Sequence, residues 1–65
     1  MATGKELRLL RFGCDLTTVQ LAAEMGISRT TLWSMERAAT VRPEQANAYR
    51  AAVARLMAKV SDAPA

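Results

Sequence analysis

The segment from Leu16 to Arg37 constrains the fold of this chain more than any other, because one glycine divides it into two short helical patterns. Before Gly26, apolar residues recur at three- and four-residue steps, and the same spacing resumes after Ile27. Glycine can adopt the left-handed backbone conformation that ends a helix and turns the chain sharply. Two helices joined so closely must bury their apolar stripes in one core. The expected inner residues are Leu21, Ala22, Met25, Ile27, Leu32 and Met35.

Capping residues predict where the first three helices begin. Thr3 followed by Glu6, and Thr17 followed by Gln20, are capping boxes, in which the hydroxyl and the later side chain satisfy free backbone amides. Ser28 is a third helix cap. We therefore expect one helix from the Thr3 cap to a close at Gly13 and Asp15, and two more over about residues 18–25 and 29–37.

The first helix is expected to turn Leu7, Leu10 and Cys14 toward the core, with Arg11 beside them. Cys14 is either a small buried hydrophobe or a redox sensor, and the lack of a second cysteine favours the first interpretation. One cysteine and no histidine exclude an internal disulfide and an ordinary Cys/His zinc site, and they remove the commonest general base. We expect no metal, no cofactor and no enzymatic activity.

A fourth helix is predicted from Pro43, whose missing amide is tolerated in the first turn, to about residue 60. Its apolar residues are spaced three and four apart, as in a heptad seam. They are Ala46, Tyr49, Val53, Leu56 and Val60. Tyr49 and Val53 are expected to close the core, while Leu56 and Val60 lie beyond it. The sequence predicts an all-α, compact four-helix domain over residues 1–60, with a flexible tail over 61–65.

Charge and hydropathy limit the partners. Nine Lys and Arg against six Asp and Glu give a net charge of +3, which favours a polyanionic partner only weakly. No apolar run approaches the roughly 20 residues of a membrane span. The N-terminus also lacks the apolar segment of a signal peptide. We expect a cytoplasmic protein that contacts no membrane and takes no small-molecule ligand.

A series of short motifs in residues 16–37 is typical of one family. They are Leu16-Thr17, Leu21-Ala22, Gly26-Ile27-Ser28, Thr31-Leu32 and Met35-Glu36-Arg37. The segment resembles the helix-turn-helix of the Cro and phage-repressor family, often called XRE-like, and the likeness runs from about Leu7 to Val53. The resemblance implies a helix-turn-helix motif over 17–37 and an ion pair between Arg11 and Glu36, while the long C-terminal helix over 43–60 is predicted from the residue pattern described above.

Three positions depart from the family pattern. Thr18 stands where the family often has a glutamine that contacts the DNA backbone and braces a recognition side chain, and threonine is too short to brace. Ala38 replaces a frequent glycine, so we expect a different exit from the third helix, such as an extra turn. Trp33 stands where the family usually has a polar residue. Its ring is expected either to touch a thymine methyl or sugar, or to pack on a neighbouring element.

The resemblance implies a sequence-specific regulator of double-stranded DNA, in particular a repressor from a phage, plasmid or other mobile element, acting in a bacterial or host cytoplasm. The third helix of such a domain enters the major groove. The base-reading candidates are Arg29, Thr30, Trp33 and Ser34. The phosphate-binding candidates are Thr18, Ser28, Thr31, Arg37 and Arg42. Lys5 and Arg8 are expected to be solvated charges.

One recognition helix touches few base pairs, so we expect a homodimer on an inverted-repeat operator. The family's larger members have a separate dimerisation domain, and here the fourth helix is expected to take that role. Its interface residues would be Ala51, Ala54, Leu56, Ala58 and Val60. Alternatively this helix only caps its own core. The alternative function is a protein-interaction module, antitoxin-like or an adaptor, which uses the C-terminal helix and Trp33.

Overall fold

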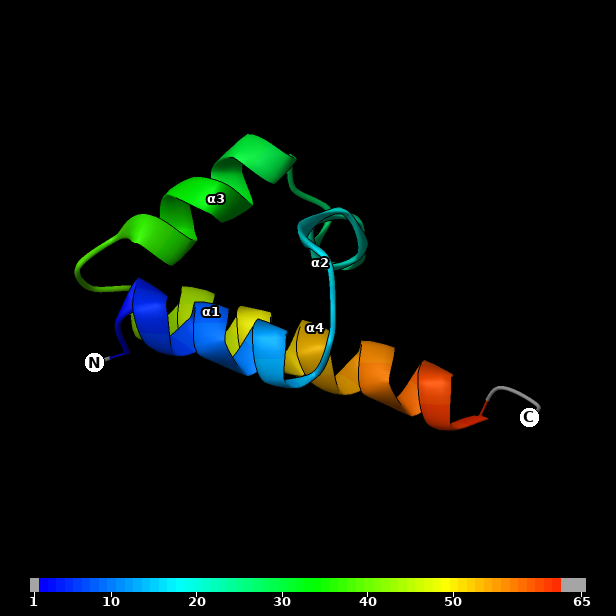
Figure 1. The fold of residues 1–65 in the computed structure, drawn as a ribbon. Helices are drawn as coiled ribbons and strands as arrows, with labels where there is room; N and C mark the ends of the chain where they lie inside the picture. Colours follow the sequence, from blue (N-terminus) through cyan, green and yellow to red (C-terminus); the bar gives the residue numbers. More distant parts are fainter. Residues whose placement is uncertain (1, 63–65) are drawn as a thin grey trace.

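Four helices make up the computed structural model, which describes residues 2–62 (Figure 1). Their bounds are α1 Gly4–Gly13, α2 Thr18–Met25, α3 Arg29–Arg37 and α4 Pro43–Asp62. α1 packs on α3 and α4, while α2 packs on α3 and α4. The all-α, four-helix prediction is confirmed. No helix within residues 2–62 combines the length and the apolar character that crossing a membrane requires.

The helices begin where local chemistry predicts. The Thr3 hydroxyl accepts from the Glu6 amide at 3.1 Å. Thr17 and Gln20 form both bonds of a capping box, at 3.1 and 2.9 Å. The turn between α2 and α3 depends on Gly26, whose φ of +71° is the left-handed conformation that ends α2. These short-range contacts alone set the ends of α2 and the turn that leads into α3.

The exit from α3 differs from the prediction of an extra turn. α3 ends at Arg37, and Ala38 is extended, with φ −69° and ψ 142°. The N-terminal segment holds this residue in place, because the amide of Gly4 donates to the carbonyl of Ala38 at 3.0 Å. Ala2 and Val41 form an antiparallel bridge just beyond it. The start of the chain therefore sets the path between α3 and α4.

Of the predicted inner residues, Leu21, Ala22 and Leu32 are buried in the core, whereas Met25, Ile27 and Met35 are half-buried and pack against it. α1 is rotated from the expected orientation. Leu7 is buried as predicted, whereas Leu10 is 37% exposed and Arg11 only 7%. Arg11 turns inward because its partner Glu36 lies on the buried side of α3. Cys14 is half-buried and packs against the core, in line with its interpretation as a small hydrophobe.

α4 covers its own domain further along than predicted. Leu56 was expected to lie beyond the core, but it is half-buried and packs against it. α2 packs on this part of α4, and its Glu24 forms ion pairs with Arg55, at 2.9 Å, and with Lys59. α4 continues to Asp62, two residues beyond the predicted end. The side chain of Val60 and residues 63–65 of the predicted tail lie outside the described residues.

Candidate nucleic-acid interface

A buried cluster beneath α3 fixes the C-terminal end of that helix. Arg11 of α1 donates from Nε to Glu36 Oε2 at 2.7 Å and from Nη2 to Oε1 at 3.0 Å. Its Nη1 donates to the carbonyl of Leu16 at 3.1 Å. The hydroxyl of Tyr49, from α4, donates to Glu36 Oε2 at 2.7 Å. One carboxylate therefore joins three helices, and Arg11 also holds the loop that leads into α2.

The partners of Glu36 keep it ionised. Burial alone would raise the pKa of Glu36, but the hydrogen bonds from Arg11 and Tyr49 and the charge of Arg11 outweigh burial and lower this pKa. The hydrogen bond to Glu36 raises the pKa of Arg11. Burial, followed by the hydrogen bond to Glu36, raises the pKa of the Tyr49 hydroxyl. All three groups keep one protonation state around neutral pH, so these hydrogen bonds hold α1, α3 and α4 together across that pH range.

Four of the exposed side chains of α3 form a surface that we call the recognition face. They are Arg29, Thr30, Trp33 and Ser34. The first three, with Thr18 from the first turn of α2, line an open concavity of about 320 Å³. The tight turn at Gly26 brings the N-terminal ends of α2 and α3 to the same side of the molecule, so polar groups of both helices face one surface.

A family model described as a helix-turn-helix domain matches residues 2–64, nearly the whole chain. The chain belongs to the helix-turn-helix family. This result confirms the resemblance to Cro and phage repressors and makes the protein a member of a family of DNA-binding regulators that is typically non-enzymatic. No curated protein and no solved structure matches the chain significantly.

Trp33 of this helix-turn-helix domain is 54% exposed, and its best-defined partner comes from its own helix. The guanidinium carbon of Arg37 lies 4.5 Å from the centroid of the Trp33 ring, which is a cation–π contact. Trp33 thus supports Arg37, and its exposed part remains at the concavity. Neither sequence interpretation mentioned this contact, although an aromatic residue four positions before an arginine on a helix signals it.

The phosphate-binding candidates of the helix-turn-helix domain lie in different places. Ser28 accepts from the Thr31 amide at 3.1 Å, and the two hydroxyls share a 2.9 Å hydrogen bond that leaves one hydroxyl hydrogen for another acceptor. Thr18 and Arg37 each border the recognition face. Arg42 is exposed in the connection before α4 and lines neither of the two cavities beside Trp33. The structure therefore gathers all of these candidates except Arg42 around α3.

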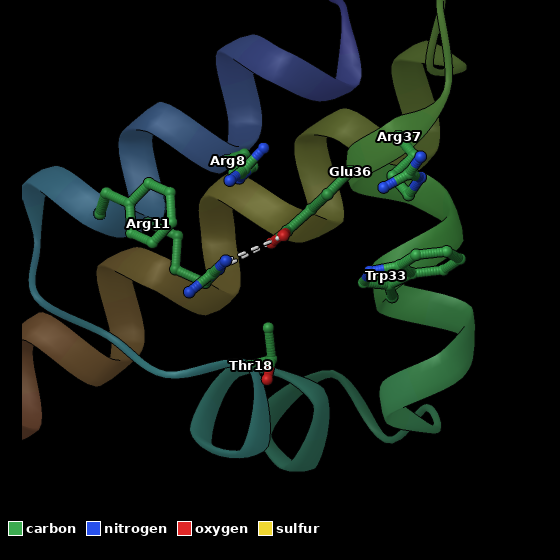
Figure 2. Close-up of a pocket in the computed structure, with 7 residues that line it drawn as sticks. Arg8, Arg11, Thr18, Trp33, Glu36 and Arg37 are labelled. Carbon is green, nitrogen blue, oxygen red and sulfur yellow. Dashed lines mark hydrogen bonds and ion pairs between the residues drawn. The ribbon is translucent and has the colours of Figure 1, made fainter.

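A second cavity, of about 180 Å³, lies between α1 and α3 of the helix-turn-helix domain (Figure 2). Arg8 and Phe12 line its α1 side, and Trp33 and Arg37 line its α3 side. Arg8 was expected to be a solvated charge, and no role was predicted for Phe12. The four-residue spacing of Arg8 and Phe12 repeats that of Trp33 and Arg37, and this was the available signal.

Proposed function

We propose that this protein is a sequence-specific double-stranded DNA-binding transcriptional regulator that represses by occupying its operator. The observation that supports this function is the recognition face of α3, which is exposed along its length and is flanked by Thr18 of α2. A DNA-reading helix needs such a face, free of the domain's own packing. The comparison with the helix-turn-helix family supports the DNA-binding part of the proposal.

In the proposed complex, α3 lies in the major groove with its N-terminal end nearest the base edges. Arg29, the first residue of α3, is exposed and forms no ion pair within residues 2–62, so its guanidinium is available to the O6 and N7 atoms of a guanine. Thr30 and Ser34 offer hydroxyls to neighbouring bases. The buried cluster at Glu36 keeps α3 at a fixed angle to the rest of the domain.

The proposed backbone contacts surround this helix. Hydroxyls from Thr18 and the Ser28–Thr31 pair, and the guanidinium of Arg37, approach phosphates beside the bases that α3 reads. Arg42 would reach the backbone from the connection that follows α3. These contacts supply affinity and register, whereas base contacts supply the choice of sequence.

We further propose that two copies bind an inverted repeat whose half-sites are about one helical turn apart. Three exposed alanines of α4, at positions 51, 54 and 58, leave a smooth strip on which a second copy can pack. Leu56 is no longer part of this proposal, because it packs inside its own domain. Sedimentation at micromolar concentration without DNA tests it: a dimer supports the strip as an interface, and a monomer contradicts it.

The function is tested by comparing Arg29→Ala with Arg42→Ala in binding assays at several salt concentrations. Arg29→Ala should cost roughly 1 to 3 kcal/mol at the preferred site and relax the base preference at one position. Arg42→Ala should weaken binding to all sequences alike and lower the salt dependence by about one phosphate contact. An Arg29→Ala protein that keeps its full base preference would refute the assignment of the recognition face.

The second candidate function is a protein-interaction module, antitoxin-like or an adaptor. It is favoured by large apolar side chains that remain at the surface, since Trp33 and Val19 are 54% and 55% exposed. A salt-dependent gel shift on random and selected DNA separates the two functions. A regulator should prefer the selected DNA and bind it with a steep salt slope, whereas an adaptor should show neither property.

A further inference from the structure

Three arginines lie over two aromatic rings at the cavity between α1 and α3, and two of them, Arg8 and Arg11, share the ring of Phe12. Arg8 lies over Phe12 at 5.1 Å, and Arg37 lies over Trp33 at 4.5 Å, measured from guanidinium carbon to ring centroid. Each pair is spaced by four residues on its own helix. Figure 2 shows Arg8 on α1 and Arg37 with Trp33 on α3, on either side of Glu36. A guanidinium group stacked on a ring four positions away therefore occurs on both α1 and α3, although the Phe12 ring also carries Arg11, at 4.6 Å.

The two outer guanidinium groups differ from the inner one in what they bind. Arg11, also at this cavity, binds Glu36 and the carbonyl of Leu16, and its guanidinium carbon lies 4.6 Å from the centroid of the Phe12 ring. Within residues 2–62, Arg8 and Arg37 form neither an ion pair nor a side-chain hydrogen bond. The lining therefore holds three guanidinium groups against one carboxylate, with a surplus of two positive charges.

The shape and position of the cavity indicate which anion it fits. Its volume of about 180 Å³ is below the roughly 300 to 1,000 Å³ of pockets that enclose a small molecule. It also shares Thr18 and Trp33 with the concavity of the recognition face, so the two form one continuous surface. The anion should therefore be small, and it should belong to a larger polymer that is already bound at α3. A phosphate group of a DNA backbone meets both conditions.

We propose that Arg8 and Arg37 form a clamp for one phosphate of the DNA backbone, which extends the DNA interface from α3 onto α1. Planar guanidinium groups bind phosphate oxygens in pairs, and stacking on a ring limits the freedom that each arginine loses on binding. Phe12 is the positioning residue for Arg8, as Trp33 is for Arg37. This proposal rests on the proposed DNA-binding function and adds a contact from a helix outside the recognition motif.

The test measures DNA affinity at several salt concentrations for Arg8→Ala and for a charge-matched control, Arg50→Ala. Arg50 is also exposed, but it lines a different cavity together with Ala2 and Pro43. Arg8→Ala should lose roughly tenfold in affinity, as expected for one hydrogen bond to a charged group. Its salt slope should fall by about 0.9, with the base preference unchanged. Arg50→Ala should match the wild type in both measurements.

The role of Phe12 is tested by a double-mutant cycle. Phe12→Leu should weaken binding roughly two- to fivefold, the range of an exposed cation–π contact, because Arg8 is less ordered. In the Arg8→Ala background the same change should have no further effect. An equal loss in both backgrounds would show that Phe12 acts independently of Arg8, for instance through Arg11 on the same ring, and would overturn its role in positioning Arg8.

The remaining outcomes separate the clamp from the function on which it rests. Sequence-specific binding by the wild type, with Arg8→Ala and Arg50→Ala indistinguishable, would overturn the clamp and leave the regulator intact. Wild-type protein without salt-dependent DNA binding would overturn both.

Competition by inorganic pyrophosphate distinguishes a backbone phosphate from a free phosphate. If it competes no better than chloride at equal ionic strength, the clamp serves the DNA backbone. If it competes better, and Arg8→Ala abolishes the advantage, the site takes free phosphates and the backbone assignment is wrong.

Discussion

Replacing Arg11 by alanine removes the main partner of a carboxylate that has almost no access to water. The side chain of Glu36 is 4% exposed and that of Arg11 is 9% exposed. In the variant, Glu36 keeps only the hydroxyl of Tyr49 as a hydrogen-bond donor among the partners described here. The loop before α2 also loses its anchor, since Arg11 holds the carbonyl of Leu16. The change therefore leaves a buried charge uncompensated and loosens the entry to the recognition motif.

The magnitude follows from these contacts. Breaking a buried ion pair by removing one partner costs roughly 3 to 5 kcal/mol, and the lost bond to the Leu16 carbonyl adds about 1 kcal/mol. A chain of 65 residues has a total free energy of unfolding of roughly 3 to 10 kcal/mol. Arg11→Ala should therefore remove a large part of the stability of the domain and leave a fraction of it unfolded at room temperature.

The same substitution should change how stability depends on pH. In the wild type the pKa of Glu36 is below its ordinary value, so its stabilisation is complete above the unfolded-state pKa and is lost as pH falls through the folded-state pKa. Without Arg11, burial dominates and the pKa of Glu36 rises above its unfolded value. Protonation then favours folding, so the deficit of Arg11→Ala should shrink between neutral pH and about pH 5.

Urea unfolding followed by circular dichroism measures both effects. Lys5→Ala is the matched control, because Lys5 is an exposed cation on the same helix, and it should change stability by less than about 0.5 kcal/mol. The double variant Arg11→Met with Glu36→Leu should recover much of the loss, since it removes the pair instead of half of it. An Arg11→Ala protein with the stability and acid sensitivity of the wild type would refute this account of the cluster.

Two further predictions concern the backbone and the side chain of Glu36 at the end of α3. Gly4→Ala should destabilise the fold by roughly 1 to 3 kcal/mol, because a Cβ atom there would lie 2.6 Å from the Glu36 carbonyl oxygen, whereas Gly13→Ala, with open space around it, should be neutral or stabilising. Equal melting temperatures for these two variants would contradict the close approach of α1 to α3. Tyr49→Phe should cost roughly 1.5 to 3 kcal/mol in urea unfolding through its lost bond to Glu36, and no measurable change would mean that Arg11 alone satisfies the carboxylate.

The helices could be predicted from the sequence because short-range contacts set their ends. Thr17 with Gln20 and the turn at Gly26 involve residues at most four apart, so their chemistry is visible in the order of the residues. The resemblance to a family added the pairing of Arg11 with Glu36, which are 25 positions apart. Local chemistry alone would not have indicated that pair.

What the sequence did not indicate depends on how the helices cross. Tyr49 was predicted to be an apolar core residue, yet its hydroxyl donates a hydrogen bond to Glu36. Leu56 was assigned to a partner surface because the sequence does not show how far along α4 the contact with α2 extends. The contact of Gly4 with the end of α3, and the meeting of Arg8 with Arg37 at one cavity, require the angle between α1 and α3. Residue spacing within one helix does not contain that angle.

Selection of bound sites from random double-stranded DNA tests the central claim, that α3 chooses a DNA sequence, more directly than any other measurement. We predict enrichment of a short motif arranged as two inverted half-sites about one helical turn apart, with a guanine whose selection is lost in Arg29→Ala. Recovery of unenriched random sequence by the wild type, or the same motif recovered by wild type and Arg29→Ala, would contradict it.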